Sequence, residues 1–351
     1  MPVRRSRQWR LCVGLLLVFT TAGACSEAET SPPALAPGPP PEAGWAALDP
    51  GPLAPRSGAS LAWTGSEVIV LGGERHRDGA AFDPARGDWR PISPSPLPAG
   101  LVRTVWTGSS LIAVTGPTGA RAAAAYDPRT DAWQALAAPP PSRFPNVSGS
   151  ARPPALHWAG GEVVLVDAWA AYDPRTDRWR DLPTPQAGHM GIDQTQAVAA
   201  AERQMWLLGA GGTSHRFDFD TGRWTALPSP PTVASNGFAD AVAVGGDVYF
   251  ASEDGQVHRL AGDDWSPVHV AAGGGGCAPE AVSVLGQPVF KLCHGIVAAS
   301  PGRWQQIPTE ARCCYRTLVS SGTALFEWDS NDDARNDPTA PRKAFHVWRP
   351  D

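Results

Sequence analysis

The chain of 351 residues contains 37 glycines and 37 prolines, and 18% of its residues are charged. Glycine and proline interrupt helices, and no stretch shows a sustained period of 3.6 residues, so the composition argues against a helical fold. The formal net charge is −5, and Lys291 and Lys343 are the only lysines. This excludes the basic face on which nucleic-acid binding depends, and we expect no nucleic-acid partner.

Residues 1–24 have the features of a secretory signal peptide. Four arginines between positions 4 and 10 precede an apolar segment, 11–24, which is too short to cross a membrane. The following Ala22-Gly-Ala-Cys25 is similar to a bacterial lipobox, in which the cysteine becomes the lipidated N-terminus. We predict a lipid anchor on Cys25 that holds the protein on the extracytoplasmic side of the cell membrane. The alternative is ordinary cleavage and secretion.

Residues 25–44 predict a tether between this anchor and the folded domain. The segment is rich in proline and lacks a long apolar run, so it cannot form a core and favours an extended polyproline II structure. At about 3.1 Å per residue it would span up to roughly 60 Å. The folded domain is expected over residues 45–351.

A repeated unit organises this domain. Tyr126-Asp-Pro-Arg-Thr-Asp-Ala-Trp133 returns as Tyr172-Asp-Pro-Arg-Thr-Asp-Arg-Trp179, and looser copies occupy 82–89 and 217–224. Asp-Pro opens a tight turn, because Asp suits its first position and Pro presets φ at the second. The unit therefore predicts a strand, a turn and a second strand that begins at a buried Trp.

The repeat has a regular period. The shared tryptophans are Trp45, Trp89, Trp133, Trp179, Trp224, Trp265 and Trp304, spaced 44, 44, 46, 45, 41 and 39 residues apart. Two further apolar strands around a glycine turn precede most of them, at 61–71, 105–114 and 156–166 and more weakly at 241–250 and 281–290. Each period thus predicts four short strands, here called a, b, c and d, which is typical of a β-propeller blade.

The chain resembles the kelch-repeat family of propellers over residues 45–351. The resemblance depends on Val70-Leu-Gly-Gly73, the Tyr-Asp-Pro-x-Thr-x-x-Trp unit and the Leu-Pro that follows it, although the Gly-Gly pair is clear only in the first repeat. It implies an all-β, kelch-like propeller of seven four-stranded blades, with six as the alternative if the blade at 240–275 is degenerate. The last repeat stops near Trp348, and we expect the strand at Trp45 to close the ring.

Cysteines separate by position. Cys277, Cys293, Cys313 and Cys314 form an even set in the last two blades, which outside the cytoplasm predicts two disulfides. We favour Cys277 paired with Cys313 and Cys293 with Cys314, with the other pairings open. A metal site with His294 is the rival interpretation, but the usual Cys-x-x-Cys spacing is missing. We expect no metal and no cofactor.

Ligand-binding residues are expected on the face of the long d–a and b–c connections, because long loops on a rigid scaffold commonly carry binding residues. Several charged residues fall at or just before the start of strand a, near the central channel of a propeller. They are Arg56, Arg103, Arg152, Asp240, Glu280 and Arg316, and His189 in the long loop 183–196 is a further candidate on the same face. Converging arginines could hold a carboxylate or phosphate, or they could pair with Asp240 and Glu280 as a structural network.

The sequence favours a binding module over an enzyme. Some kelch-type propellers are copper radical oxidases that use two Tyr and two His, but of the four tyrosines here only Tyr315 lies outside a repeat or strand position. We predict a monomeric, lipid-anchored module for a protein partner or a surface glycan. The alternative is a carbohydrate-active enzyme, a sugar isomerase or hydrolase, that uses the arginines and carboxylates of the channel.

Overall fold

A computed structural model was obtained for the whole chain, which divides into two units, Met1–Pro41 and Glu42–Asp351. Structure is described here for part of the second unit only. The described residues are 43–73, 75–115, 121–142, 155–185, 195–209, 212–230, 239–252, 254–270, 279–292, 295–300, 303–307, 316–329 and 345–350. Cys25 and the predicted signal peptide lie outside them. Among the described residues no helix is long and apolar enough to cross a membrane.

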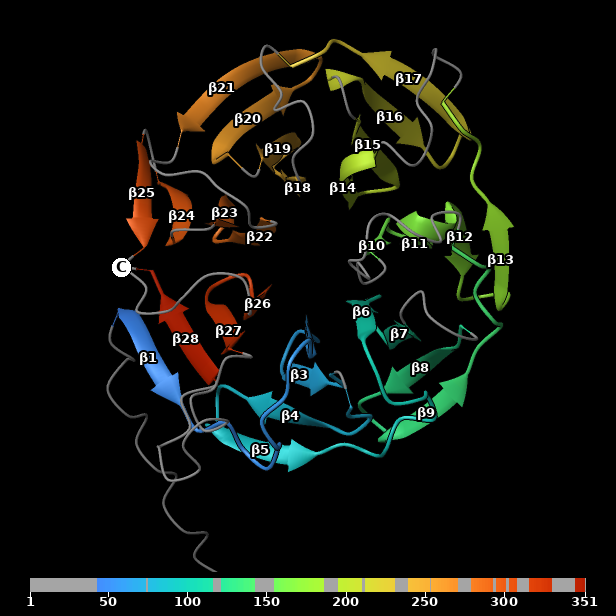
Figure 1. The fold of residues 1–351 in the computed structure, drawn as a ribbon, viewed down its shortest axis with the longest axis vertical. Helices are drawn as coiled ribbons and strands as arrows, with labels where there is room; N and C mark the ends of the chain where they lie inside the picture. Colours follow the sequence, from blue (N-terminus) through green and yellow to red (C-terminus); the bar gives the residue numbers. More distant parts are fainter. Residues whose placement is uncertain are drawn as a thin grey trace, which may run out of the picture. The chain divides into compact units, whose positions relative to one another are not determined.

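Seven four-stranded antiparallel sheets form a ring, with strand a of each sheet innermost and strand d outermost (Figure 1). The first blade comprises β2 (Ser60–Trp63), β3 (Val68–Leu71), β4 (Gly79–Asp83) and β5 (Asp88–Pro91). The second comprises β6 (Val102–Trp106), β7 (Leu111–Thr115), β8 (Ala123–Asp127) and β9 (Ala132–Ala135). The third comprises β10 (Leu156–Trp158), β11 (Val163–Leu165), β12 (Ala170–Asp173) and β13 (Arg178–Asp181).

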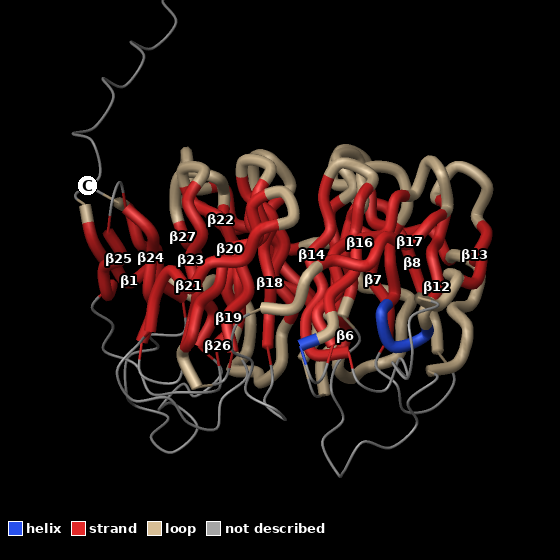
Figure 2. Tube along the Cα trace, turned by 90° about the horizontal axis from the view of Figure 1, so that it is seen from above, coloured by secondary structure: helices blue, strands red, loops and turns tan. Residues whose placement is uncertain are grey.

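The remaining blades repeat this order. The fourth comprises β14 (Thr195–Ala201), β15 (Gln204–Gly209), β16 (Ser214–Asp218) and β17 (Arg223–Leu227). The fifth comprises β18 (Ala239–Val244), β19 (Asp247–Ser252), β20 (Gln256–Ala261) and β21 (Asp264–Val270). The sixth comprises β22 (Glu280–Val284), β23 (Gln287–Leu292), β24 (Gly295–Ser300) and β25 (Arg303–Ile307). The 3-10 helix Val166–Ala168 lies in the b–c connection of the third blade and is the larger blue segment near β12 in Figure 2.

The seventh blade joins the two ends of the domain. It contains β26 (Arg316–Ser320), β27 (Leu325–Asp329), β28 (Phe345–Arg349) and, as its outermost strand, β1 (Gly44–Leu48). Trp45 pairs with Trp348 in the same way that Trp133 pairs with Tyr126 in the second blade. The predictions of seven blades and of closure by the N-terminal strand are therefore confirmed. Closure gives the seventh blade its fourth strand, so that this blade, like the others, presents only short edges.

Five of the seven repeat tryptophans tie their blade to the one before it. The indole Nε1 donates a hydrogen bond to a backbone carbonyl just after the outer strand of the preceding blade. The pairs, at 2.6–2.9 Å, are Trp89 with Asp49, Trp133 with Ser93, Trp179 with Ala137, Trp224 with Pro183 and Trp265 with Pro228. In the first four blades the ring also packs against the strand c aromatic of its own blade, as Trp133 does on Tyr126 at 5.1 Å between centroids. The motif thus connects blades as well as filling them.

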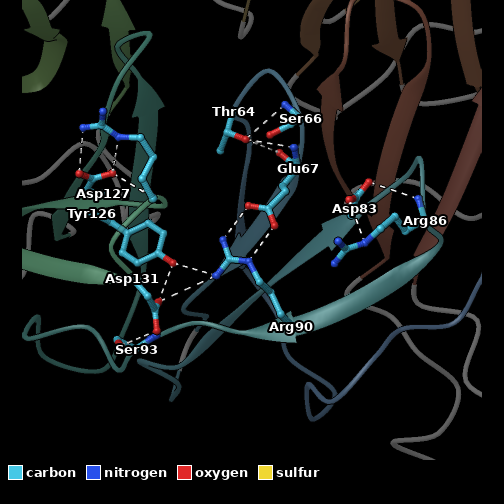
Figure 3. A network of polar contacts seen from close by, with 11 residues as sticks. Thr64, Ser66, Glu67, Asp83, Arg86, Arg90, Ser93, Tyr126, Asp127 and Asp131 are labelled. Carbon is cyan, nitrogen blue, oxygen red and sulfur yellow. Dashed lines mark hydrogen bonds and ion pairs between the residues drawn. The ribbon is translucent and has the colours of Figure 1, made fainter. Parts of the chain in front are cut away.

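The acidic residues of the motif have two different uses. Asp127 opens the c–d turn, where its Oδ1 accepts a hydrogen bond from the Arg129 backbone N–H at 2.9 Å. Asp131 reaches the preceding blade instead and accepts hydrogen bonds from Ser93 N–H at 2.9 Å and Ser93 Oγ at 2.8 Å. Figure 3 shows how Tyr126 joins this contact by donating to Asp131 at 2.7 Å. The fixed spacing between Tyr126 and Asp131 therefore lets both residues take part in one contact between blades.

An arginine on strand d completes the same network. Arg90 donates to both carboxylate oxygens of Glu67 at 2.7 and 2.6 Å and to the Tyr126 hydroxyl at 3.1 Å (Figure 3). Arg180 and Glu162 repeat the pair in the third blade at 2.8 and 2.7 Å. Bidentate arginine–carboxylate pairs are among the stronger polar contacts, so the glutamates at the start of strand b are neutralised within their own blades.

Candidate functional site

The inner strands surround the axis of the ring (Figure 1), and each blade has one equivalent residue in or directly before its inner strand. In each blade, one residue near the end of strand a pairs with the first buried residue of strand b. The residue three positions before it occupies the equivalent position. These residues are Ser60, Arg103, Ala155, Ala197, Asp240, Glu280 and Thr317. Three of the sequence-predicted candidates therefore occupy one structural position in the second, fifth and sixth blades.

At this position, polar side chains bind the backbone of a neighbouring blade. Asp240 Oδ2 accepts a hydrogen bond from Ala281 N–H at 2.8 Å, and Glu280 Oε2 accepts one from Leu318 N–H at 3.1 Å. Ser60 Oγ accepts the corresponding bond from Thr104 N–H at 3.1 Å in the first and second blades. The two carboxylates therefore do the same structural work as a serine hydroxyl.

The seventh blade closes this inner set of contacts. Thr317 Oγ1 donates a hydrogen bond to the carbonyl of Ala59 at 3.2 Å, just before the first inner strand. The two hydroxyls Ser60 Oγ and Thr104 Oγ1 are also 2.8 Å apart. Side chains of the inner strands thus connect the fifth, sixth, seventh, first and second blades in turn. Tryptophans of the outer strands connect the seventh blade to the first and so on as far as the fifth.

The electrostatics of the two carboxylates differ. Burial raises the pKa of Asp240 to about 7, with a further rise from the charge of Glu280, although two backbone N–H bonds act in the opposite direction. Glu280 lies 3.1 Å from the Lys291 ammonium, its cross-strand neighbour on β23. A protonated share of Asp240 therefore exists at neutral pH, whereas Glu280 is held as half of an ion pair.

Arg103 is the cation at this position without a carboxylate partner among the described residues. Its guanidinium donates only to the carbonyl of its own neighbour, Val102, at 3.4 Å. Burial lowers the pKa of Arg103, and the negative charge of Glu280 opposes that change. A guanidinium stays protonated in proteins and carries five donors, so Arg103 has the capacity to bind an anionic or hydroxyl-bearing ligand.

His157, two positions further along the equivalent strand of the third blade, was not among the predicted site residues. Burial lowers its pKa to about 4, so the imidazole is neutral at physiological pH. Lys291 was likewise missed. Lys291 lies opposite Glu280, but this register can be recognised only once the two strands are paired.

Arg56 differs from the expectation that it could contact a ligand. Its side chain has no exposed surface, and both terminal nitrogens bind the Asp78 carboxylate at 3.0 Å. It also donates to the carbonyls of Ala54 and Gly72 at 3.0 and 3.3 Å. Arg56 thus secures the b–c connection of the first blade, and its donors are used within the protein.

The structure describes little or nothing of the remaining predicted residues. Arg316 begins β26, opposite Asp329, and only its backbone is described. Arg152, His189, Cys277, Cys293, Cys313 and Cys314 lie outside the described residues. Within the described ranges, no group of three His, Cys, Asp or Glu side chains is suited to hold a metal ion.

Comparisons with known proteins agree on the fold. No family model matches the chain, and no curated protein matches it. Among solved structures, "Structure of YjhT" matches with a TM-score of 0.52 and 12% identity over 74% of this chain and 99% of that one. PorZ of Porphyromonas gingivalis, described as an essential bacterial surface component of the type-IX secretion system, matches with a TM-score of 0.54 and 13% identity over 81% of this chain. The match spans 36% of PorZ, and at these identities the likeness establishes a shared β-propeller fold.

Proposed function

We propose that this protein is an extracytoplasmic, lipid-anchored propeller that acts as a binding module for a protein partner or a surface glycan. The observation that carries the proposal is the use of Asp240 and Glu280 as hydrogen-bond acceptors for the backbone of the next blade. Carboxylates committed to the scaffold are poor general acids or bases, because a proton transferred to or from them would disturb a contact between blades. The ring is then a rigid support for binding surfaces.

The proposed location depends on the first 44 residues. A basic and apolar leader, the Cys25 lipobox and a proline-rich tether together favour an anchored domain outside the cytoplasm. PorZ, a propeller-containing bacterial surface component, provides an example of the fold at a cell surface. We further propose two disulfides among Cys277, Cys293, Cys313 and Cys314, a kelch-type origin for the repeat and a monomeric state.

The location is tested by fractionating cells that express the protein or its Cys25→Ser variant. An anchored protein partitions into the detergent phase of a Triton X-114 extract, and the variant moves to the aqueous phase or the medium. Accessibility to an added protease in intact cells or spheroplasts then distinguishes the outer side from the cytoplasm. Equal partitioning of both proteins would refute the lipid anchor, and protease resistance that is lost only on lysis would refute the location.

A carbohydrate-active enzyme is the second candidate, and one observation favours it. Arg103 has no carboxylate partner among the described residues, and Asp240, with a pKa of about 7, belongs to the same ring of inner positions. An arginine and a partly protonated carboxyl group on the inner strands of one ring are the two kinds of group needed to bind and protonate a sugar. If the protein is an enzyme, replacing either residue should abolish turnover. If it is a binding module, the parent protein should show no turnover.

Binding itself is tested by thermal unfolding of the purified protein with a panel of sugars, nucleotides and metal ions. A ligand at about 100 times its Kd stabilises the folded state by about 2.7 kcal/mol. A shift that disappears in Arg103→Met would locate the ligand at the ring axis. No shift with any small molecule, together with specific cross-links on intact cells, would favour a protein partner.

A further inference from the structure

The edge of the ring that carries the a–b turns has an unusual feature in its first three blades. Trp63, Trp106 and Trp158 each end strand a and pair with the first buried residue of strand b. The equivalent residues of the other four blades are Ala200, Ala243, Ser283 and Ser320. Large aromatic rings therefore occupy one position in three consecutive blades, which we call the tryptophan crescent.

These tryptophans differ from the repeat tryptophans in their polar contacts. Five of the seven repeat tryptophans donate from Nε1 to a backbone carbonyl of the preceding blade, as Trp133 does at 2.8 Å, whereas Trp45 Nε1 is enclosed without a partner among the described residues. The Nε1 groups of Trp63, Trp106 and Trp158 make no hydrogen bond to any described residue, and unlike that of Trp45 they are not fully enclosed. A partly exposed indole with a free donor combines an apolar face with a polar edge, which suits a binding surface.

Each ring is held firmly on one side. Trp63 stacks on Phe326 of the seventh blade at 6.3 Å between centroids and 9° between planes. Trp106 and Trp158 pack against the apolar clusters between the first and second and between the second and third blades. All three tryptophans remain partly exposed to solvent. A ligand would therefore meet rings whose orientation is already set, which lowers the entropic cost of binding.

The turns beside these rings are rigid and small. Thr64 Oγ1 accepts a hydrogen bond from Glu67 N–H at 3.0 Å, and Thr107 Oγ1 accepts one from Ser110 N–H at 3.2 Å. Both turns continue with Gly and Ser, and the turn of the third blade has Gly160 followed by another glycine. The space around Gly65 and Gly108 is open, whereas in the third blade the Arg203 side chain lies against Gly161.

The crescent is also electrically balanced and lacks exposed aliphatic groups. Glu67 and Glu162, next to its turns, form ion pairs with Arg90 and Arg180 at 2.6 and 2.7 Å. Of the described residues, Leu285 is the one large hydrophobic side chain that is strongly exposed, and it lies in the sixth blade. Arg203, which lies against the third-blade turn, is likewise paired, with Asp220. These groups therefore provide neither the excess of cations that polyanions require nor aliphatic anchors for a peptide.

We propose that the tryptophan crescent binds an uncharged oligosaccharide, whose apolar ring faces stack on the indoles while its hydroxyls accept hydrogen bonds from Nε1. The proposal rests on the proposed function, since it names the ligand class of the binding module. It places the glycan on the a–b edge of the ring, opposite the connections between strands b and c. Trp106 is the central member, with a crescent tryptophan in the blade on either side.

The test uses the full chain purified in detergent and isothermal titration with the hexasaccharides of β-1,4-linked glucose, mannose and N-acetylglucosamine. We expect at least one to bind, with an affinity that stays constant between 0.05 and 0.5 M NaCl because no charges are involved. Trp106→Leu, which keeps apolar volume but removes the ring, should weaken binding about tenfold, equal to about 1.4 kcal/mol. Trp106→Phe should weaken it about threefold.

Trp133→Phe is the matched control, because that indole lies on the outer strand and its Nε1 is already bonded. It should leave the affinity unchanged. Should Trp106→Leu fail to fold, Trp106→Phe and Trp158→Phe carry the comparison. Binding that survives all crescent substitutions would overturn this site while leaving the binding module intact. Binding of heparin or a protein in place of every neutral hexasaccharide would overturn the ligand class, and no ligand of any kind would overturn the proposed function as well.

Discussion

Asp240→Ser separates the structural role of the inner carboxylates from their charge. Serine already occupies the equivalent position in the first blade, where Ser60 Oγ accepts the hydrogen bond from the next blade at 3.1 Å. A serine at 240 can therefore keep the contact with the Ala281 N–H but cannot ionise. The variant loses the second bond, from the Ala241 N–H, and that cost does not depend on pH.

The expected pH dependence follows from the raised pKa of Asp240. The folded value is about 7 against an ordinary 3.8, so between these values the folded protein binds more protons than the unfolded chain. Raising the pH through this window lowers the free energy of unfolding of the parent protein. At 1.36 kcal/mol per pH unit, the largest loss of stability across this window is about 4 kcal/mol. Because a protein interior rearranges around a buried charge, we expect a loss of about 1–3 kcal/mol.

Urea unfolding of the parent and of Asp240→Ser at pH 4.5, 6 and 8 measures this effect. Histidines titrate in both proteins and cancel in the difference between them. We expect the difference to move in favour of the variant by about 1–3 kcal/mol as the pH rises from 4.5 to 8. A difference that is constant within about 0.5 kcal/mol, or that moves the other way, would refute the assignment of a buried, partly protonated carboxyl group.

Three further substitutions test the scaffold. Trp133→Phe removes the Nε1 bond to the Ser93 carbonyl and should lower the free energy of unfolding by about 1–2 kcal/mol in urea titration; no change would contradict its role as a tie. Lys291→Met removes the ammonium 3.1 Å from Glu280 and should cost about 1–3 kcal/mol, read as a lower Tm at pH 7, whereas an unchanged Tm would show that the pair is dispensable. Gly79→Ala would bring a Cβ within 2.7 Å of the Val70 carbonyl oxygen and should cost about 1–3 kcal/mol by calorimetry, unless the strand shifts without loss.

The propeller could be predicted because its signals are local and repeated. A tight turn, an aromatic residue and a Trp recur within eight residues, and the missing partner of Trp348 could be identified by matching Trp45 to Trp133. The fifth and sixth blades lack the Asp-Pro turn for a simple reason. The strand c residue opposite Trp265 is Leu260, five positions away, whereas Tyr126 is seven positions from Trp133. The shorter hairpin has no room for the motif.

The inner contacts could be predicted only in part. The sequence places Asp240 and Glu280 near the start of strand a, but their partners, the backbone N–H groups of Ala281 and Leu318, belong to the following blades. Arg56 illustrates the opposite problem. Its place in the chain resembles that of Arg103, yet its side chain turns into the protein toward Asp78, and chain position alone does not determine side-chain direction. The crescent tryptophans were visible in the repeats but could not be distinguished from core residues without their unbonded Nε1 groups.

The most direct test of the central claim follows both binding and chemical change in one experiment. The purified protein is incubated with the neutral hexasaccharides and with an extract of envelope glycans, binding is measured by titration, and the recovered sugars are examined by NMR for altered anomers, epimers or cleaved linkages. A binding module predicts saturable binding with the sugars recovered unchanged. Catalytic conversion of a sugar that ceases in both Asp240→Ser and Arg103→Met would contradict it and establish the inner ring as an active site.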